Sequence, residues 1–161
     1  MTPDELSAGW VRAWSGRDAE AFGPLCAPDV QYQDPVTPLP LRGASEIAEH
    51  AATLWAGIPD AQMQPSGAAL HDARHAALPC RLTGTHSGRL GRLPPSGRSL
   101  AVYGVFYCRI ELGRLVGVRA FFDAYDAAVQ LGVLPPRDSL GERALMLLRG
   151  FGVNRGRAPT S

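Results

Sequence analysis

Apolar positions recur with a helical period in the first third of the chain and with a strand period after it. Thr2-Pro3-Asp4-Glu5 is a capping box with proline at the first helical position, which predicts a helix ending near Gly16. A short second helix is expected from Asp18. The clearest helix covers residues 44–57, because one side of it is apolar at Ile47, Ala51, Leu54, Trp55 and Ile58.

Alternating residues then predict strands. Val30-Gln31-Tyr32-Gln33 alternates up to Asp34-Pro35, and the proline-rich segment 35–43 is read as a loop. Beyond residue 61 strand-like alternation dominates, and the strands expected there include 78–86, 99–112 and 115–122. A Gly/Pro-rich connection is expected at 87–98. Helices followed by an antiparallel meander indicate an α+β fold.

The C-terminal part reads as helical. A short helix at 124–131 is closed by Gly132 and the prolines that follow. A second capping box, Ser139-Leu140-Gly141-Glu142, precedes an apolar run, which favours a helix that docks on the domain or binds a partner. We therefore expect a domain at 1–136 and a C-terminal helical extension and tail at 137–161, with about the last six residues disordered.

Composition excludes several function classes. A chain of 161 residues with 45% hydrophobic and 19% charged residues is typical of one globular domain. Its formal net charge of +1 gives no global attraction to nucleic acid or to an anionic membrane, so neither partner is expected. All 16 basic residues are arginine, which excludes a lysine Schiff base.

Cysteine and histidine spacing predicts no metal site and no disulfide framework. Cys26, Cys80 and Cys108 are far apart and lie among apolar residues, so buried thiols are expected. The chain has no apolar run of transmembrane length and no signal-peptide pattern at its N-terminus. We therefore expect a cytoplasmic location.

Three motifs carry a family resemblance: CAPDVQYQDP at 26–35, GTHSGRLGRLPPSGR at 84–98 and FFDAYDAAVQLGVLPP at 121–136. Together they resemble the SnoaL-like polyketide (ester) cyclases of the nuclear-transport-factor-2-like superfamily. The resemblance implies a cone in which a curved antiparallel or mixed sheet wraps around the N-terminal helices and leaves a pocket at its open end. It also implies acid/base catalysis without a cofactor.

The resemblance names Asp123 as the general acid/base, at the end of the last strand. A carboxylate in an apolar cavity has a raised pKa suited to removing a proton next to a carbonyl. The alternative is that Asp123 caps helix 124–131. His86 is the second catalytic candidate, because it shares a strand face with Leu82 and Gly84. The alternative is that His86 is a core histidine whose ring bonds to the backbone.

Five further residues are candidates for substrate binding: Arg119, Asp34, Tyr32, Tyr103 and Phe121. Arg119 stands where many family members carry Trp, and alternation places it on the face of Phe121 and Asp123. It would either pair with Asp123, lowering its pKa, or anchor an anionic group in the pocket. Asp34 precedes a proline, so it is equally well interpreted as a turn former. Tyr32 and Tyr103 are equally well interpreted as core residues, because aromatic residues on strands are usually buried.

The sequence therefore favours a cofactor-independent cyclase, isomerase or lyase acting on a hydrophobic small molecule. The alternative is a non-catalytic ligand-binding or dimerisation module of the same fold. An Asp123 that is enclosed in the pocket, with Arg119 away from it, would favour the enzyme. An Asp123 that is exposed or paired with an arginine would favour the binding module. Because the strands at 99–122 carry apolar residues on both faces, we also expect a homodimer.

Overall fold

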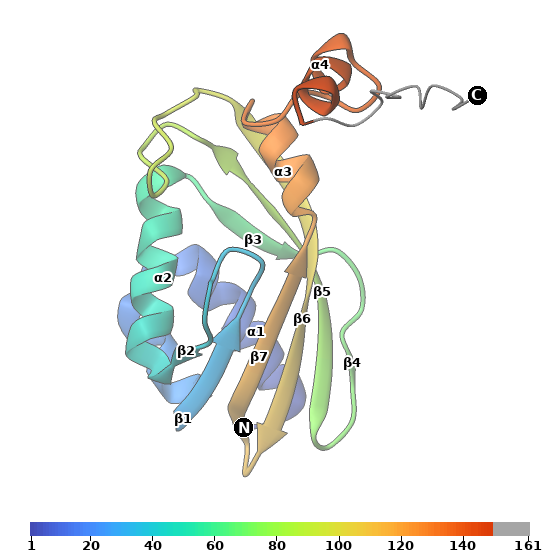
Figure 1. The fold of residues 1–161 in the computed structure, drawn as a ribbon. Coiled ribbons are helices and arrows are strands. Elements are labelled where there is room, and N and C mark those ends of the chain that lie inside the picture. Colours follow the sequence, from blue (N-terminus) through green and yellow to red (C-terminus); the bar gives the residue numbers. More distant parts are fainter. Residues whose placement is uncertain (150–161) are drawn as a thin grey trace, which may run out of the picture.

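A curved sheet wraps around two helices in the computed structural model, which describes residues 1–149 (Figure 1). The expectation of disorder at the extreme C-terminus lies outside these residues. The helical elements are α1 (Pro3–Gly16), η1 (Ala19–Leu25), α2 (Gly43–Gly57), α3 (Ala124–Gln130) and α4 (Leu140–Leu148). The strands are β1 (Cys26–Gln33), β2 (Leu41–Arg42), β3 (Gln62–Pro65), β4 (Leu70–His71), β5 (His75–Thr85), β6 (Ser99–Glu111) and β7 (Arg114–Phe122). The α+β class is confirmed.

The N-terminal helices follow their local signals. The Thr2 hydroxyl accepts a hydrogen bond from the Glu5 backbone N–H, and the Glu5 carboxylate accepts one from the Thr2 N–H, so the capping box is confirmed. The second predicted helix is a 3₁₀-helix, η1, which contains Pro24. Proline removes a backbone donor, and this favours the tighter, shorter helix.

The sheet is mixed and open. Its strand order is β2-β1-β7-β6-β5-β3, with β4 pairing on β5. β1 runs parallel to β7, and the other pairs are antiparallel. The sequence placed the start of β1 at Val30, four residues late, because Pro28 and Asp29 interrupt the alternation near Cys26. β2 lies inside the segment that was read as a loop.

The core lies between α1, α2 and the concave face of the sheet. Trp10, Phe22 and Tyr32 are fully or almost fully buried there, and Trp10 packs edge-to-face against Phe22 and Phe106. Trp55 donates its indole N–H to the backbone carbonyl of Trp14 at 2.8 Å, which joins α2 to α1. A smaller cluster of Ile58, Ala61, Leu100 and Val102 covers the other end of the sheet.

The C-terminal helices lie at one end of the cone (Figure 1). Ser139 caps α4 by accepting the Glu142 backbone N–H, which is the N-cap half of the predicted capping box. The Glu142 carboxylate accepts the backbone N–H of Asp138 and not that of Ser139, so the box itself does not close. The Tyr125 hydroxyl donates to the Glu142 carboxylate at 3.0 Å, and this bond holds α4 against α3. Among the described residues, none of the helices has the length and apolar character needed to span a bilayer.

Candidate functional site

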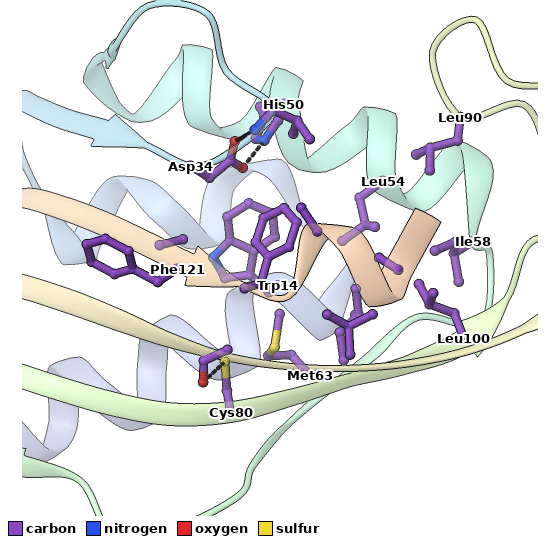
Figure 2. Close-up of a pocket in the computed structure, with 18 of the residues that line it drawn as sticks. Trp14, Asp34, His50, Leu54, Ile58, Met63, Cys80, Leu90, Leu100 and Phe121 are labelled. Carbon is purple, nitrogen blue, oxygen red and sulfur yellow. Dashed lines mark hydrogen bonds and ion pairs between the residues drawn. The ribbon is translucent and has the colours of Figure 1, made fainter. Parts of the chain in front are cut away.

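A cavity of about 540 Å³ lies between α2, α3 and the concave face of the sheet. Most of its walls are aliphatic or aromatic. Figure 2 shows Asp34 and His50 at one end of the cavity and Ile58, Leu90 and Leu100 at the other. A mostly apolar cavity with a few convergent polar groups is the usual form of a small-molecule site.

Asp34 is the buried carboxylate of this cavity, at the end of β1. Its side chain is only 4% exposed. One oxygen, Oδ1, accepts the backbone N–H groups of Val36 and Thr37 at 2.9 Å each. The other, Oδ2, accepts the Tyr32 hydroxyl at 3.0 Å and lies 2.7 Å from Nε2 of His50. Four donors therefore fill the accepting positions of this carboxylate.

These bonds keep Asp34 ionised. Burial alone would raise the pKa of Asp34, but the hydrogen bond and charge of His50, together with donors from Val36 and Tyr32, bring it below its ordinary value. Burial, followed by the nearby Asp34 charge, raises the pKa of Tyr32 well above its ordinary value. Tyr32 therefore stays protonated and acts as a donor to Asp34.

His50, on α2, lines the cavity and is 23% exposed. Because Asp34 is ionised and only accepts, Nε2 of His50 carries a hydrogen, and in the neutral imidazole Nδ1 then carries the lone pair. Nδ1 makes no hydrogen bond within residues 1–149. The ring packs edge-to-face against Trp14, with centroids 6.2 Å apart. The pair therefore presents one oriented imidazole to an apolar cavity.

Sequence reasoning identified Asp34 and Tyr32 but missed His50. The signal was present, because His50 is three residues after Ile47 and four before Leu54, on the same stripe of α2. A titratable residue inside an apolar helical stripe is unusual enough to mark a candidate site. The expectation that Asp34 forms a turn is also confirmed by its bonds to Val36 and Thr37.

Asp123 lies outside the cavity, contrary to expectation. It is exposed, and its Oδ1 accepts the Asp126 backbone N–H at 2.8 Å, so it caps α3. The carboxylate therefore lacks the desolvated surroundings that its expected acid/base role requires. Asp123 is the N-cap between β7 and α3, and its side chain faces solvent there.

His86 is buried but does not line the cavity. Its Nδ1 accepts the Ser96 backbone N–H at 3.2 Å and lies 2.9 Å from the Ser96 hydroxyl. The His86 backbone also pairs with Arg98 and Gly97, so this residue holds together the base of the 87–98 loop. The alternative of a core histidine is thus the one that the structure supports, although Nε2 has no partner among the described residues.

Arg119 and Tyr103 lie on the convex face of the sheet and not in the cavity. Arg119 is exposed and stacks over the Phe121 ring at 5.5 Å, and no ion pair with Asp123 forms within the described chain. Tyr103 is 60% exposed beneath Arg81. Phe121 is half-exposed at the cavity rim, where it contributes to the lining. Alternation along β6 and β7 turns these side chains away from the buried Phe106 and Ala120.

The three cysteines are free and buried, as expected. Burial raises the pKa of the Cys80 thiol, which lines the cavity, to about 11. Residues 1–149 hold no group of three or more His, Cys, Asp or Glu side chains that could bind a metal ion. His50 and Asp34 are among the polar side chains that line the cavity.

Comparison with known proteins identifies the family. The profile of the SnoaL-like polyketide cyclases matches residues 5–131. The chain belongs to this family. The matched segment contains β1, α2, the cavity-lining strands and α3, and it ends before α4. A search of curated sequences gives no significant match.

Solved structures show the same fold at low identity. IdmH, a candidate polyketide cyclase from Streptomyces antibioticus, aligns with a TM-score of 0.71 and 24% identity over 82% of this chain and 99% of IdmH. AclR, a candidate hydroxylase from Streptomyces galilaeus, aligns with a TM-score of 0.72 and 20% identity over 91% of each chain. A protein of ketosteroid isomerase-like fold from Catenulispora acidiphila aligns with a TM-score of 0.69 and 21% identity over 82% of this chain and 95% of that protein. At these identities the likeness establishes the ketosteroid isomerase-like fold and not the activity.

Proposed function

We propose that this SnoaL-like protein is an acid/base enzyme of cyclase or isomerase type, in which His50 moves a proton on a hydrophobic substrate held in the cavity. The observation that carries the proposal is the pairing of His50 with the buried Asp34 carboxylate at the polar end of an otherwise apolar cavity. Asp34 is a positioning residue, because its four donors leave it no free accepting position. His50 is the residue that contacts substrate.

The proposed step begins with Nδ1 of His50 removing a proton from a carbon next to a carbonyl. The C–H bonding pair passes to the carbonyl oxygen, giving an enolate, and the imidazolium is stabilised through Nε2 by the Asp34 carboxylate. In an isomerisation, the proton returns to another carbon of the same molecule. In a cyclisation, the enolate carbon attacks an electrophilic carbonyl in the molecule, and the new alkoxide takes the proton. Neither step requires a cofactor.

Hydrogen–deuterium exchange tests this step without knowledge of the natural substrate. 4-Phenylcyclohexanone in D₂O serves as the probe, and mass spectrometry follows deuterium uptake next to its carbonyl. We expect the wild type to accelerate uptake. His50→Gln should lower the accelerated rate by about 10²–10⁴-fold, the usual contribution of a positioned acid or base. His75 does not line the cavity, and it offers the matched control, since His75→Gln should leave the rate unchanged.

The rival proposal is a non-catalytic ligand-binding module. The exposure of Asp123, the residue that the family resemblance named as acid/base, favours this alternative. The two proposals differ in one measurement. A wild-type protein that binds the ketone but does not accelerate deuterium uptake would be a binding module, and uptake that survives in His50→Gln would exclude His50 as the base.

A further inference from the structure

The cavity has a polar end and an aliphatic end. Asp34 and His50 lie at the first, and Ile58, Leu90 and Leu100 lie together at the second (Figure 2). In the proposed reaction, the reacting carbon of the substrate lies at His50. The rest of an apolar substrate is then best placed along the aliphatic walls, because burial of each CH₂ group there removes apolar surface from water. The aliphatic end therefore limits the length of the substrate.

Leu90 differs from the other two residues at this end in what lies behind it. Ile58 is 0% exposed and Leu100 is 6% exposed, so the core of the protein backs both side chains. Leu90 is half-buried and follows exposed Arg89 on the 87–98 loop, which lies at the surface. A smaller residue in place of Leu90 would therefore lengthen the cavity toward solvent, whereas a smaller residue in place of Ile58 would widen it within the core.

The loop is held against the end of α2 in a way that positions Leu90. Gly88 donates its backbone N–H to the Gly57 carbonyl at 3.0 Å. A Cβ on Gly57 would lie 2.7 Å from the Cβ of Leu90, so Leu90 occupies the space that a side chain on Gly57 would need. Leu90 and Leu93 also exchange two backbone hydrogen bonds, of 3.0 and 2.9 Å, which close the turn that carries Leu90. These contacts place the Leu90 side chain at the end of the cavity.

The helix α2 sets the distance between the two ends. His50 and Gly57 are seven positions apart on this helix, which corresponds to about 10 Å along its axis. Because Leu90 packs against Gly57, a ligand whose reacting carbon lies at His50 meets Leu90 after roughly that distance. A six-membered ring with a tail of a few carbons spans this length.

We propose that Leu90 is a specificity-determining residue, whose side chain closes the aliphatic end of the cavity and sets the longest apolar tail that a substrate can carry. The proposal rests on the proposed function in placing the reacting carbon at His50. It goes further by assigning the substrate class, a ketone whose apolar tail extends from the reacting end toward Leu90, and the residue that selects for the length of that tail. A longer tail would collide with Leu90 or displace the loop, and such overpacking is unfavourable.

A homologous series of ketones tests this role of Leu90. 4-Methyl-, 4-propyl-, 4-pentyl- and 4-heptylcyclohexanone carry the tail opposite the carbonyl, and isothermal titration calorimetry gives their dissociation constants. In the wild type, we expect each added CH₂ group to tighten binding by about fourfold until the tail reaches Leu90, and to bring no further gain beyond that length. Binding that tightens at this rate through the whole series, or a protein that binds none of the four ketones, would overturn the proposal.

Leu90→Ala and Leu93→Ala tie the limit to one side chain. Leu90→Ala removes most of the side chain that closes the cavity, so the first ketone beyond the wild-type limit should bind this variant about tenfold more tightly than it binds the wild type. Leu93→Ala makes the same change in the same loop at a position that does not line the cavity, so the limit should stay where it is. A limit that moves equally in both variants would mean that loosening of the loop, and not the Leu90 side chain, sets it.

Leu90→Phe tests the same position in the opposite direction. The larger side chain should shorten the cavity, so the longest ketone that the wild type accommodates should bind this variant about tenfold or more weakly. 4-Methylcyclohexanone should bind it as tightly as the wild type, which shows that the variant is folded and its polar end intact. A limit that is the same in the wild type, Leu90→Ala and Leu90→Phe would exclude Leu90 as the residue that selects for length.

These binding measurements are independent of proton transfer. Deuterium uptake by the same four ketones tests the proposed function. A limit that moves with the size of residue 90, although the wild type accelerates uptake by none of the ketones, would remove the enzyme proposal and leave the role of Leu90 in place. Accelerated uptake that His50→Gln abolishes, together with a limit that does not respond to Leu90, would do the reverse.

Discussion

Tyr32 donates its hydroxyl hydrogen to Oδ2 of Asp34, the same oxygen that His50 contacts. The tyrosine that the sequence suggested as a substrate-binding residue thus supports the carboxylate behind the histidine. The three side chains form one hydrogen-bonded network around the buried Asp34 carboxylate. Tyr32 remains a donor, Asp34 remains ionised, and Asp34 orients the His50 ring through Nε2.

Tyr32→Phe distinguishes two possible roles of the Tyr32 hydroxyl, which are hydrogen bonding to Asp34 and contact with the substrate. It removes one donor to a charged acceptor, so we expect unfolding free energy to fall by about 1.5–3 kcal/mol. The concentration of ketone that half-saturates deuterium exchange should not change. Tyr107→Phe, on the exposed face, should alter stability by less than about 0.5 kcal/mol. A large rise in the half-saturating concentration for Tyr32→Phe would mean that its hydroxyl contacts the ligand.

Asp34 should make stability dependent on acid pH. Its pKa is lower in the folded chain than in the unfolded chain, so its stabilising contribution is complete above the ordinary carboxylate pKa and is lost as pH falls through the lowered folded value. Asp34→Asn should therefore be destabilised by about 1–3 kcal/mol near neutral pH, and the difference from wild type should shrink in acid. Urea unfolding from about pH 7 to about pH 3 measures this.

Asp29, exposed on the same strand, supplies the control for that experiment. Asp29→Asn should follow the wild-type pH dependence throughout. A difference between wild type and Asp34→Asn that stays constant down to the lowest pH would contradict the assignment of a lowered pKa to Asp34.

Asp123 should behave as a helix cap. Asp123→Asn keeps an oxygen that can accept the Asp126 N–H, so stability and deuterium exchange should both stay near wild type. Asp123→Ala should lose about 1 kcal/mol of stability through the missing cap. A drop of about 100-fold or more in exchange for Asp123→Asn would restore the role that the family resemblance first suggested.

The convex face of the sheet should mediate self-association. Tyr103 and Tyr107 are each about half-exposed or more along β6, and solvent contact with these aromatic rings is unfavourable. We expect a homodimer by light scattering at tens of micromolar, as for a standard interface. Tyr103→Glu should give a monomer. Leu112→Glu, in the fully exposed β6–β7 turn, should leave the dimer intact.

Gly88 should not tolerate a side chain. A Cβ at this position would collide with the backbone carbonyl of Ala56, where the 87–98 loop is joined to α2 by a hydrogen bond from the Gly88 N–H to the Gly57 carbonyl. Gly88→Ala should destabilise the protein by about 1–3 kcal/mol in thermal unfolding. Gly16 has open space around it, so Gly16→Ala should be neutral or slightly stabilising. Equal melting temperatures for the two variants would contradict this packing.

The sequence by itself determined the elements whose signals are local. These signals are the capping box at Thr2, the N-cap at Ser139, the apolar stripe of α2 and the alternation of β5 and β6. Each acts within one or two helical turns or a single strand. The family motifs then predicted the curved sheet around the helices. Asp34 could be recognised as a candidate because its strand end and the following proline are adjacent in the chain.

The tertiary structure alone decided which polar side chains meet. His50 lies 16 residues from Asp34 in sequence, and only the packing of α2 against β1 brings Nε2 within 2.7 Å of the carboxylate. Likewise, the direction of α3 after β7 decides that Asp123 faces solvent, although a strand end next to two phenylalanines suggested an enclosed position. Periodicity fixes the face of an element on which a residue lies. Whether that face meets a cavity, solvent or another chain depends on how distant elements pack.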